Sequence, residues 1–111
     1  MVVSSLSFGQ TFYSENMGTP SGTTPIASNV FQNASPIVYS GTGDVRATSV
    51  STGYTGASGG GNVFINAATE YFQIDGLNTS AYNTADIQLS FGYNAGGNVA
   101  NIATLEYSTN G

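Results

Sequence analysis

The chain has 111 residues, with six acidic side chains and a single basic one, Arg46, and it contains no Cys, His, Trp or Lys. A nucleic-acid backbone is bound by several Lys or Arg side chains that displace its counterions, so the net charge of −5 predicts no nucleic acid as a partner. Zinc, iron–sulfur and haem sites within the chain are excluded for lack of Cys and His, as are Ser–His and Cys–His nucleophile pairs.

The first ten residues, MVVSSLSFGQ, are interpreted as the remnant of a secretion signal peptide. They combine a short apolar run with the small–x–small triplet Ser7-Phe8-Gly9, and the alternative is an ordinary first strand. The length predicts a single domain over residues 11–111. No stretch approaches the roughly 20 apolar residues of a membrane span, so no membrane span is expected.

Short runs bounded by Gly, Pro, Asn or Ser predict β-strands, and sustained helical periodicity is absent. The strongest pattern is ADIQLSFGY at 85–93, where Ile87, Leu89, Phe91 and Tyr93 alternate with polar or small residues. Eight short strands predict an all-β fold, an antiparallel β-sandwich of jelly-roll-like topology. In chain order the predicted strands are 11–16, 29–33, 36–40, 45–50, 62–66, 70–76, 85–93 and 101–108.

The last predicted strand leads into Asn110-Gly111, which is a hairpin signal. A hairpin turn is normally followed by a second strand that pairs with the first. Without that second strand, the segment 101–108 would be an edge strand with one side unpaired. The sandwich domain over residues 11–111 is therefore expected to be truncated at its C-terminal side.

A glycine-rich run, STGYTGASGGGNVFI at 51–65, raises the question of a phosphate-binding loop. Such a loop places a Lys after its last glycine and leads into a helix. Here Asn62 and Val63 follow Gly61, and the next residues are β-like. The run is therefore interpreted as a turn-rich connection that precedes a strand.

Two charged positions, Asp44 and Arg46, are two residues apart and would share a face of a strand. They could pair, with Arg46 as a structural anchor, or Asp44 could bind a cation. The only cofactor candidate is calcium, which takes carboxylate oxygens. There is no D-x-D-x-D-G run, so solvated surface acids are the alternative. The calcium candidates are Asp44, Asp75, Asp86 and Glu70.

Seven tyrosines are more than a core of this size needs, and aromatic rings with a polar tip suit sugar stacking and protein interfaces. Tyr54 and Tyr82 fall in predicted loops, and Tyr71 points away from Phe72 on a predicted strand. These three tyrosines are the predicted ligand-binding residues, and packing at the edge of the core is expected of the others. The six acids have no supporting His or Arg cluster, so no catalysis is expected.

Two segments carry a resemblance to a known family, SGTGDVRATSVSTGYTGASGGGNVFI at 40–65 and YFQIDGLNTSAYNTADIQLSFGY at 71–93. They resemble an N-terminal β-sandwich domain of secreted, multidomain Bacteroidetes proteins, which commonly leave the cell by a signal peptide and then by type IX secretion. The leader SLSFGQ followed by TFYSENMGTPSGTTPI is similar to their signal-cleavage region. The resemblance implies an accessory, jelly-roll-like module that is secreted or displayed on the outer cell surface, beside neighbouring domains of a longer parent protein.

Two functions follow from these observations and stay open at this point. One is a non-catalytic binding or adhesion module that recognises a polysaccharide or another cell-surface polymer through its loops and tyrosines. The other is a structural spacer attached to an extracellular hydrolase such as a nuclease, with no ligand of its own.

Overall fold

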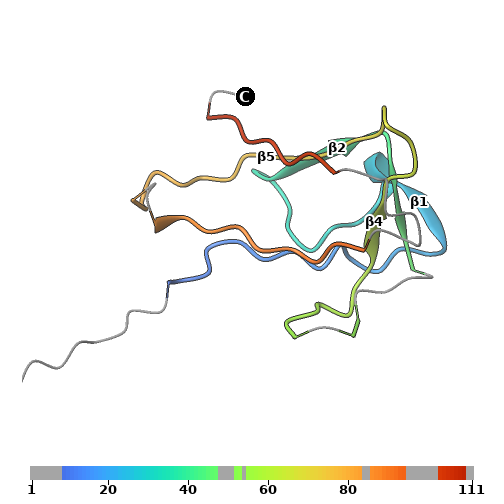
Figure 1. Cartoon of the computed structure of the whole chain (residues 1–111), viewed down its shortest axis with the longest axis horizontal. Helices are drawn as coiled ribbons and strands as arrows, with labels where there is room; N and C mark the ends of the chain where they lie inside the picture. Colours follow the sequence, from blue (N-terminus) through green and yellow to red (C-terminus); the bar gives the residue numbers. More distant parts are fainter. Residues whose placement is uncertain (1–8, 48–51, 54, 84–85, 95–102, 110–111) are drawn as a thin grey trace, which may run out of the picture.

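The computed structural model describes residues 9–47, 52–53, 55–83, 86–94 and 103–109 (Figure 1). Within them the regular structure consists of short β-strands and one turn of 3-10 helix, with no α-helix, which confirms the all-β class. In chain order these elements are β1 (Thr23–Pro25), η1 (Ile26–Ser28), β2 (Val38–Gly41), β3 (Asp44–Arg46), β4 (Asn62–Phe64) and β5 (Phe72–Asp75).

The strands form two antiparallel sheets, one with the order β1-β3-β4 and the other made of β2 and β5. In the first sheet the central strand β3 places Val45 between Thr24 of β1 and Val63 of β4. β1 is an edge strand, which is why it can contain Pro25: proline has no N–H to give to a ladder and is tolerated where one side is unpaired.

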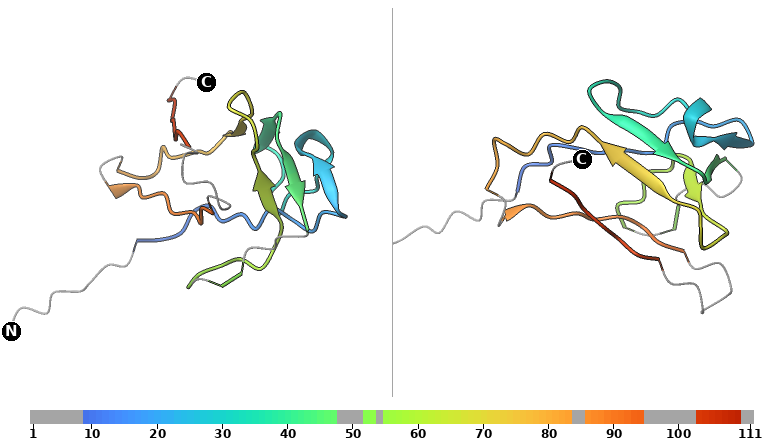
Figure 2. Two further views of the ribbon diagram at one scale, coloured as in Figure 1. Left: turned by 45° about the vertical axis from the view of Figure 1, so that its right-hand side comes forward. Right: turned by 90° about the horizontal axis from the view of Figure 1, so that it is seen from above.

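A sharp corner at Thr42-Gly43 joins the two sheets, because β2 and β3 are separated by these two residues only and belong to different sheets (Figure 2). The backbone N–H groups of Thr42 and Gly43 both donate to the Tyr71 carbonyl oxygen, at 3.1 and 3.5 Å. Gly41 precedes the corner with a φ of 153°, and a Cβ there would collide with the same carbonyl. The corner therefore requires glycine at position 41.

The fully buried apolar side chains of the described residues are Ile26 and Val45. Val45 is central in the three-stranded sheet, and Ile26 extends from η1 to the corner, where its Cδ1 lies against Gly41. The core therefore sits where the two sheets meet, under the corner that joins them.

The predicted strands 36–40, 62–66 and 70–76 overlap β2, β4 and β5, and β3 includes the first two residues of the predicted strand 45–50. The predictions for 11–16 and 29–33 were wrong, since neither segment forms a strand. The same holds for the described parts of 85–93 and 101–108, residues 86–93 and 103–108. Alternation had marked an apolar face there, yet Leu89, Phe91, Tyr93, Leu105 and Tyr107 are exposed. A strand needs a backbone partner as well as an apolar face.

No helix in the described part of the chain is long and apolar enough to cross a membrane.

Ile26→Ala should lower the free energy of unfolding by about 2–5 kcal/mol, because the lost methylene groups leave a cavity under the corner. Val38→Ala is the control: Val38 is 56% exposed, and its loss should change the stability by about 0.5 kcal/mol or less. Urea unfolding of both variants measures the difference. Equal losses would show that the core does not lie at Ile26.

Candidate functional site

The Glu15 carboxylate is the centre of a hydrogen-bond network that ties the N-terminal segment to the rest of the fold. Its Oε1 accepts from the backbone N–H groups of Met17 and Gln32, at 2.8 and 2.9 Å. Its Oε2 accepts from the Asn33 backbone N–H at 3.0 Å, from the Asn33 side-chain amide at 2.9 Å and from the Tyr39 hydroxyl at 2.6 Å. One side chain thus joins residues 15–17, the loop at 32–33 and strand β2.

A chain of hydroxyl groups continues from this carboxylate. Tyr13 donates to the Tyr39 hydroxyl oxygen at 3.1 Å, and Tyr39 donates to Glu15. Burial and the hydrogen bond to Glu15 raise the pKa of Tyr39. Burial acts to raise the pKa of Glu15, but the hydrogen bonds from Tyr39, Gln32 and Asn33 outweigh it and leave that pKa below its ordinary value. The ionised carboxylate is therefore the form that the fold favours.

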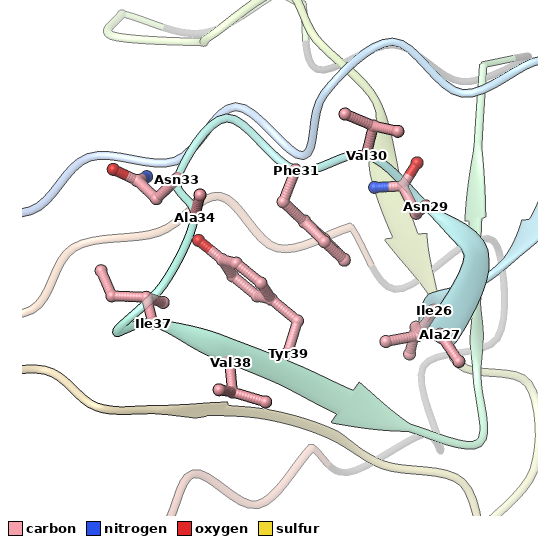
Figure 3. Close-up of a pocket in the computed structure, with 10 residues that line it drawn as sticks. All are labelled: Ile26, Ala27, Asn29, Val30, Phe31, Asn33, Ala34, Ile37, Val38 and Tyr39. Carbon is pink, nitrogen blue, oxygen red and sulfur yellow. The ribbon is translucent and has the colours of Figure 1, made fainter.

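The Tyr39 ring stacks on Phe31, with ring centroids 3.9 Å apart and planes at 15°. The ring of Phe72 in β5 lies 6.0 Å from Phe31 and 6.1 Å from Tyr39, so the three rings form a triangular cluster. Beside this cluster lies an open depression of about 420 Å³ whose walls include Phe31, Ile37 and Tyr39 (Figure 3). In Figure 3 the rings of Phe31 and Tyr39 lie next to each other.

A second hollow lies on the other side of Ile37, and we call it the aromatic groove. It is open, with a volume of about 250 Å³. The rings of Phe12 and Tyr82 stack in its wall with centroids 4.7 Å apart and planes at 26°. The full set of residues that line the aromatic groove is Phe12, Tyr13, Pro36, Ile37, Gly76, Leu77, Asn78 and Tyr82.

The backbone at Gly76 shapes one wall of the aromatic groove. Gly76 follows β5 with a φ of 82°, and a Cβ there would collide with the Pro36 carbonyl oxygen. Glycine is required because the chain must turn in a left-handed conformation while it passes close to Pro36. The groove is thus formed by three loop segments, 12–13, 36–37 and 76–82, rather than by the face of a sheet.

The structure separates the predicted ligand-binding tyrosines. Tyr82 lies in the aromatic groove. Tyr71 is 48% exposed at the corner, at the opposite end of β5 from Gly76, about 16 Å away at roughly 3.3 Å per extended residue. Tyr54 lies outside the described residues. Of the three, Tyr82 alone is placed in the groove.

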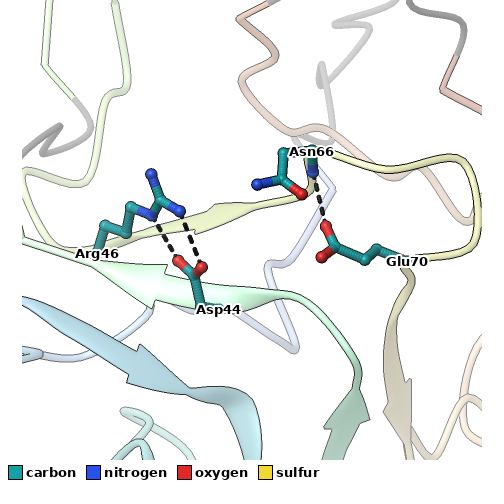
Figure 4. A network of polar contacts seen from close by, with 4 residues as sticks. All are labelled: Asp44, Arg46, Asn66 and Glu70. Atoms are coloured by element: carbon teal, nitrogen blue, oxygen red, sulfur yellow. Dashed lines mark hydrogen bonds and ion pairs between the residues drawn. The ribbon is translucent and has the colours of Figure 1, made fainter.

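Asp44 and Arg46 form a bidentate pair on β3, with Arg46 Nε at 2.6 Å from Asp44 Oδ1 and Nη2 at 2.9 Å from Oδ2 (Figure 4). The guanidinium also lies over the Phe64 ring, 3.5 Å from its centroid. The hydrogen bond to Asp44 raises the pKa of Arg46, and the charges of Asp44 and Glu70 add to this effect. Arg46 thus links β3 to β4 across the sheet surface.

The four calcium candidates are not assembled into one site. Asp44 is held by Arg46, Glu70 accepts from the Asn66 backbone N–H at 2.7 Å, and Asp75 accepts from the Gln73 amide at 2.8 Å (Figure 4). The side chain of Asp86 is exposed. No group of three or more acidic, His or Cys side chains in the described part of the chain is arranged to hold a metal ion.

Sequence reasoning missed Glu15, Phe12 and Tyr39. One signal was available: Glu15 is the only charged residue among the first 43, and a lone charge in so long an uncharged stretch suggests a specific partner. Phe12 was placed on a predicted strand, and its stacking with a residue 70 positions away follows only from the fold.

Comparison with protein-family models, with curated proteins and with solved structures gives no match for this chain.

Glu15→Gln should lower the free energy of unfolding at neutral pH by about 2 kcal/mol, because the bonds to an ionised acceptor are replaced by weaker ones. The folded-state pKa of Glu15 lies below its ordinary value of 4.5, so its stabilisation is present above that pH. It is lost as the pH falls through the folded-state pKa. The difference between wild type and variant should therefore shrink between pH 7 and about pH 3 in urea unfolding.

The control for this experiment is Glu106→Gln, the same change at an exposed position, which should leave the stability unchanged at both pH values. A gap between wild type and Glu15→Gln that stays constant across the acid range would contradict the role of the Glu15 charge.

Arg46→Ala should lower the midpoint of thermal unfolding by a few degrees, since it removes both the bidentate pair and the contact with Phe64. Arg46→Lys should recover only part of the loss, because an ammonium group cannot match the forked geometry. Differential scanning fluorimetry measures both. Full recovery by lysine would mean that only the charge matters.

Proposed function

We propose that this chain is a non-catalytic binding module of an exported protein and that its aromatic groove binds a polysaccharide or another surface polymer. The single observation that supports this best is the stacked pair of Phe12 and Tyr82 in the wall of an open groove. We propose as well that the two sheets belong to a jelly-roll-like β-sandwich. Their antiparallel pairing and the sharp corner between them are compatible with that architecture.

The chemistry of the groove suits a sugar ring. The C–H groups on one face of a pyranose pack against aromatic rings, and its hydroxyl groups need donors and acceptors at the edge of the contact. Phe12 is 37% exposed and Leu77 38%, so both present apolar surface to a ligand. Asn78 stands beside them with a carboxamide that can bond to hydroxyl groups.

Export is part of the same proposal. The apolar leader with its Ser7-Phe8-Gly9 triplet supports it, as does the resemblance of residues 40–65 and 71–93 to secreted Bacteroidetes domains. In that setting the module would act outside the cell or on its outer surface, next to other domains of its parent protein.

A second candidate is favoured by the exposed apolar side chains that follow the groove in sequence. Leu89, Phe91, Tyr93 and Leu105 are each 58–65% exposed, and Tyr107 is 93% exposed. Exposed apolar surface on this scale is typical of an interface. In this alternative the chain is a spacer whose apolar side chains are covered by a neighbouring domain, for example an extracellular hydrolase such as a nuclease.

Tyr82→Ala should weaken retention on an immobilised polysaccharide about fivefold, because the loss of a stacked ring costs on the order of 1 kcal/mol. Screening of the purified chain on a glycan array identifies the ligand, and affinity gel electrophoresis with that polymer then measures the variants. Tyr82→Phe should keep most of the retention, since it retains the ring.

The matched control is Tyr107→Ala, which removes an exposed tyrosine that does not line the aromatic groove. It should bind as the wild type does. A blank array with a folded protein would favour the spacer, and so would equal effects of the two alanine substitutions.

A further inference from the structure

The aromatic groove has a lining without formal charge. Apart from the hydroxyl groups of Tyr13 and Tyr82, none of its side chains is ionisable, and its polar side chain is the neutral amide of Asn78. The Asn78 Oδ1 accepts the Ser80 backbone N–H at 3.0 Å. Asn78 is an exposed residue, and its amide nitrogen donates to no group among the described residues.

Arg46 is the only basic side chain of the sequence, and its interactions lie outside the groove. Arg46 is bonded to Asp44 and lies over Phe64, within the sheet β1-β3-β4. In Figure 1 that sheet is at the right, while the groove segments near residues 12 and 76–82 are at the left. Protein sites that bind polyanions use Arg or Lys to pair with each carboxylate or sulfate. The groove has no such residue within its reach.

The charges beside the groove are negative. Asp75 directly precedes Gly76 of the lining, and Glu15 is connected to Tyr13 through the Tyr39 hydroxyl, at 2.6 and 3.1 Å for the two successive bonds. Burial, and to a smaller extent the charge of Glu15, raise the pKa of Tyr13, against the opposing effect of the Tyr39 hydrogen bond. The whole chain carries −5, so an approaching polyanion is repelled.

We propose that the aromatic groove selects uncharged sugar chains and rejects uronate or sulfated ones, because it offers stacking and amide hydrogen bonds but no counter-charge. The inference rests on the proposed function, since it names the ligand class of the same groove. An anionic residue placed there would lose part of its hydration without gaining a partner, which disfavours its binding. A neutral ring loses little and gains the aromatic contact.

Matched polymers test the charge of the ligand alone. Hydroxyethylcellulose and carboxymethylcellulose share a β-glucan backbone, and dextran and dextran sulfate share an α-glucan backbone. Affinity gel electrophoresis should show retention by at least one neutral polymer, at least about tenfold stronger than by its anionic counterpart. The retention by the neutral polymer should not change between about 20 mM and about 500 mM NaCl, because no ion pair contributes to it.

A charge placed in the groove should alter this selection. Asn78→Lys should create retention by the anionic counterpart, and that retention should disappear at high salt. Tyr107→Lys adds the same charge at an exposed position outside the groove and should not create it. Circular dichroism of both variants verifies that they fold as the wild type does.

The outcomes separate the two proposals. Stronger retention on an anionic polymer that Tyr82→Ala abolishes would overturn the charge selection and leave the binding function standing. Retention by none of the four polymers, with a blank glycan array, would overturn both. Equal gains from Asn78→Lys and Tyr107→Lys would show that net charge, rather than the groove, determines which polymer is bound.

Discussion

In the N-terminal part of this structure, hydrogen bonds to the Glu15 carboxylate hold the chain against its neighbours, as the backbone bonds of a sheet would. Residues 12–17 form no strand, yet four hydrogen bonds to the Glu15 side chain join them to the loop at 32–33 and to β2, and a fifth comes from Met17 within the segment. A backbone ladder spreads such bonds over several residues, whereas here they converge on two oxygens. The Asn33 amide also donates to the Ser14 carbonyl oxygen, and the Asn16 backbone N–H donates to the Gln32 side chain. The positions of Phe12 and Tyr13 therefore depend on a network that has the ionised Glu15 at its centre.

The corner at Thr42-Gly43 imposes the second constraint. Because β2 and β3 belong to different sheets, the chain must turn within two residues, and Gly41 and the Tyr71 carbonyl make this turn feasible. The buried residues Ile26 and Val45 lie on the two sides of this turn, Ile26 against Gly41 and Val45 in β3. A core this small leaves aromatic side chains at the periphery, and the aromatic groove is formed from such peripheral rings between loops that the corner and Glu15 hold in place.

Short runs bounded by turn residues predicted β2 and β4, and alternation predicted β5; each of these strands pairs with a neighbour through side chains that suit a half-buried surface. These patterns missed β1, whose Pro25 is tolerated because the strand lies at the edge of its sheet. Alternation failed at 86–93, where the apolar face exists without a described strand partner. Periodicity specifies which side chains lie on one face but not which segment lies beside them. The same limit applies to the site: Tyr82 could be predicted from its loop, but its stacking partner Phe12 could not.

Stability and binding are connected in this arrangement. Phe12 and Tyr13 line the groove and are joined by a short length of chain to Glu15, so we expect protonation of Glu15 to loosen the segment that carries one wall. If the wall is ordered in only a fraction of the molecules, the apparent affinity of the groove for a ligand is lowered in proportion to that fraction. Conversely, a ligand that requires that wall favours the ionised carboxylate, because both stabilise the same state. The one acid in the first 43 residues would thus act on the fold and on the groove through the same hydrogen bonds.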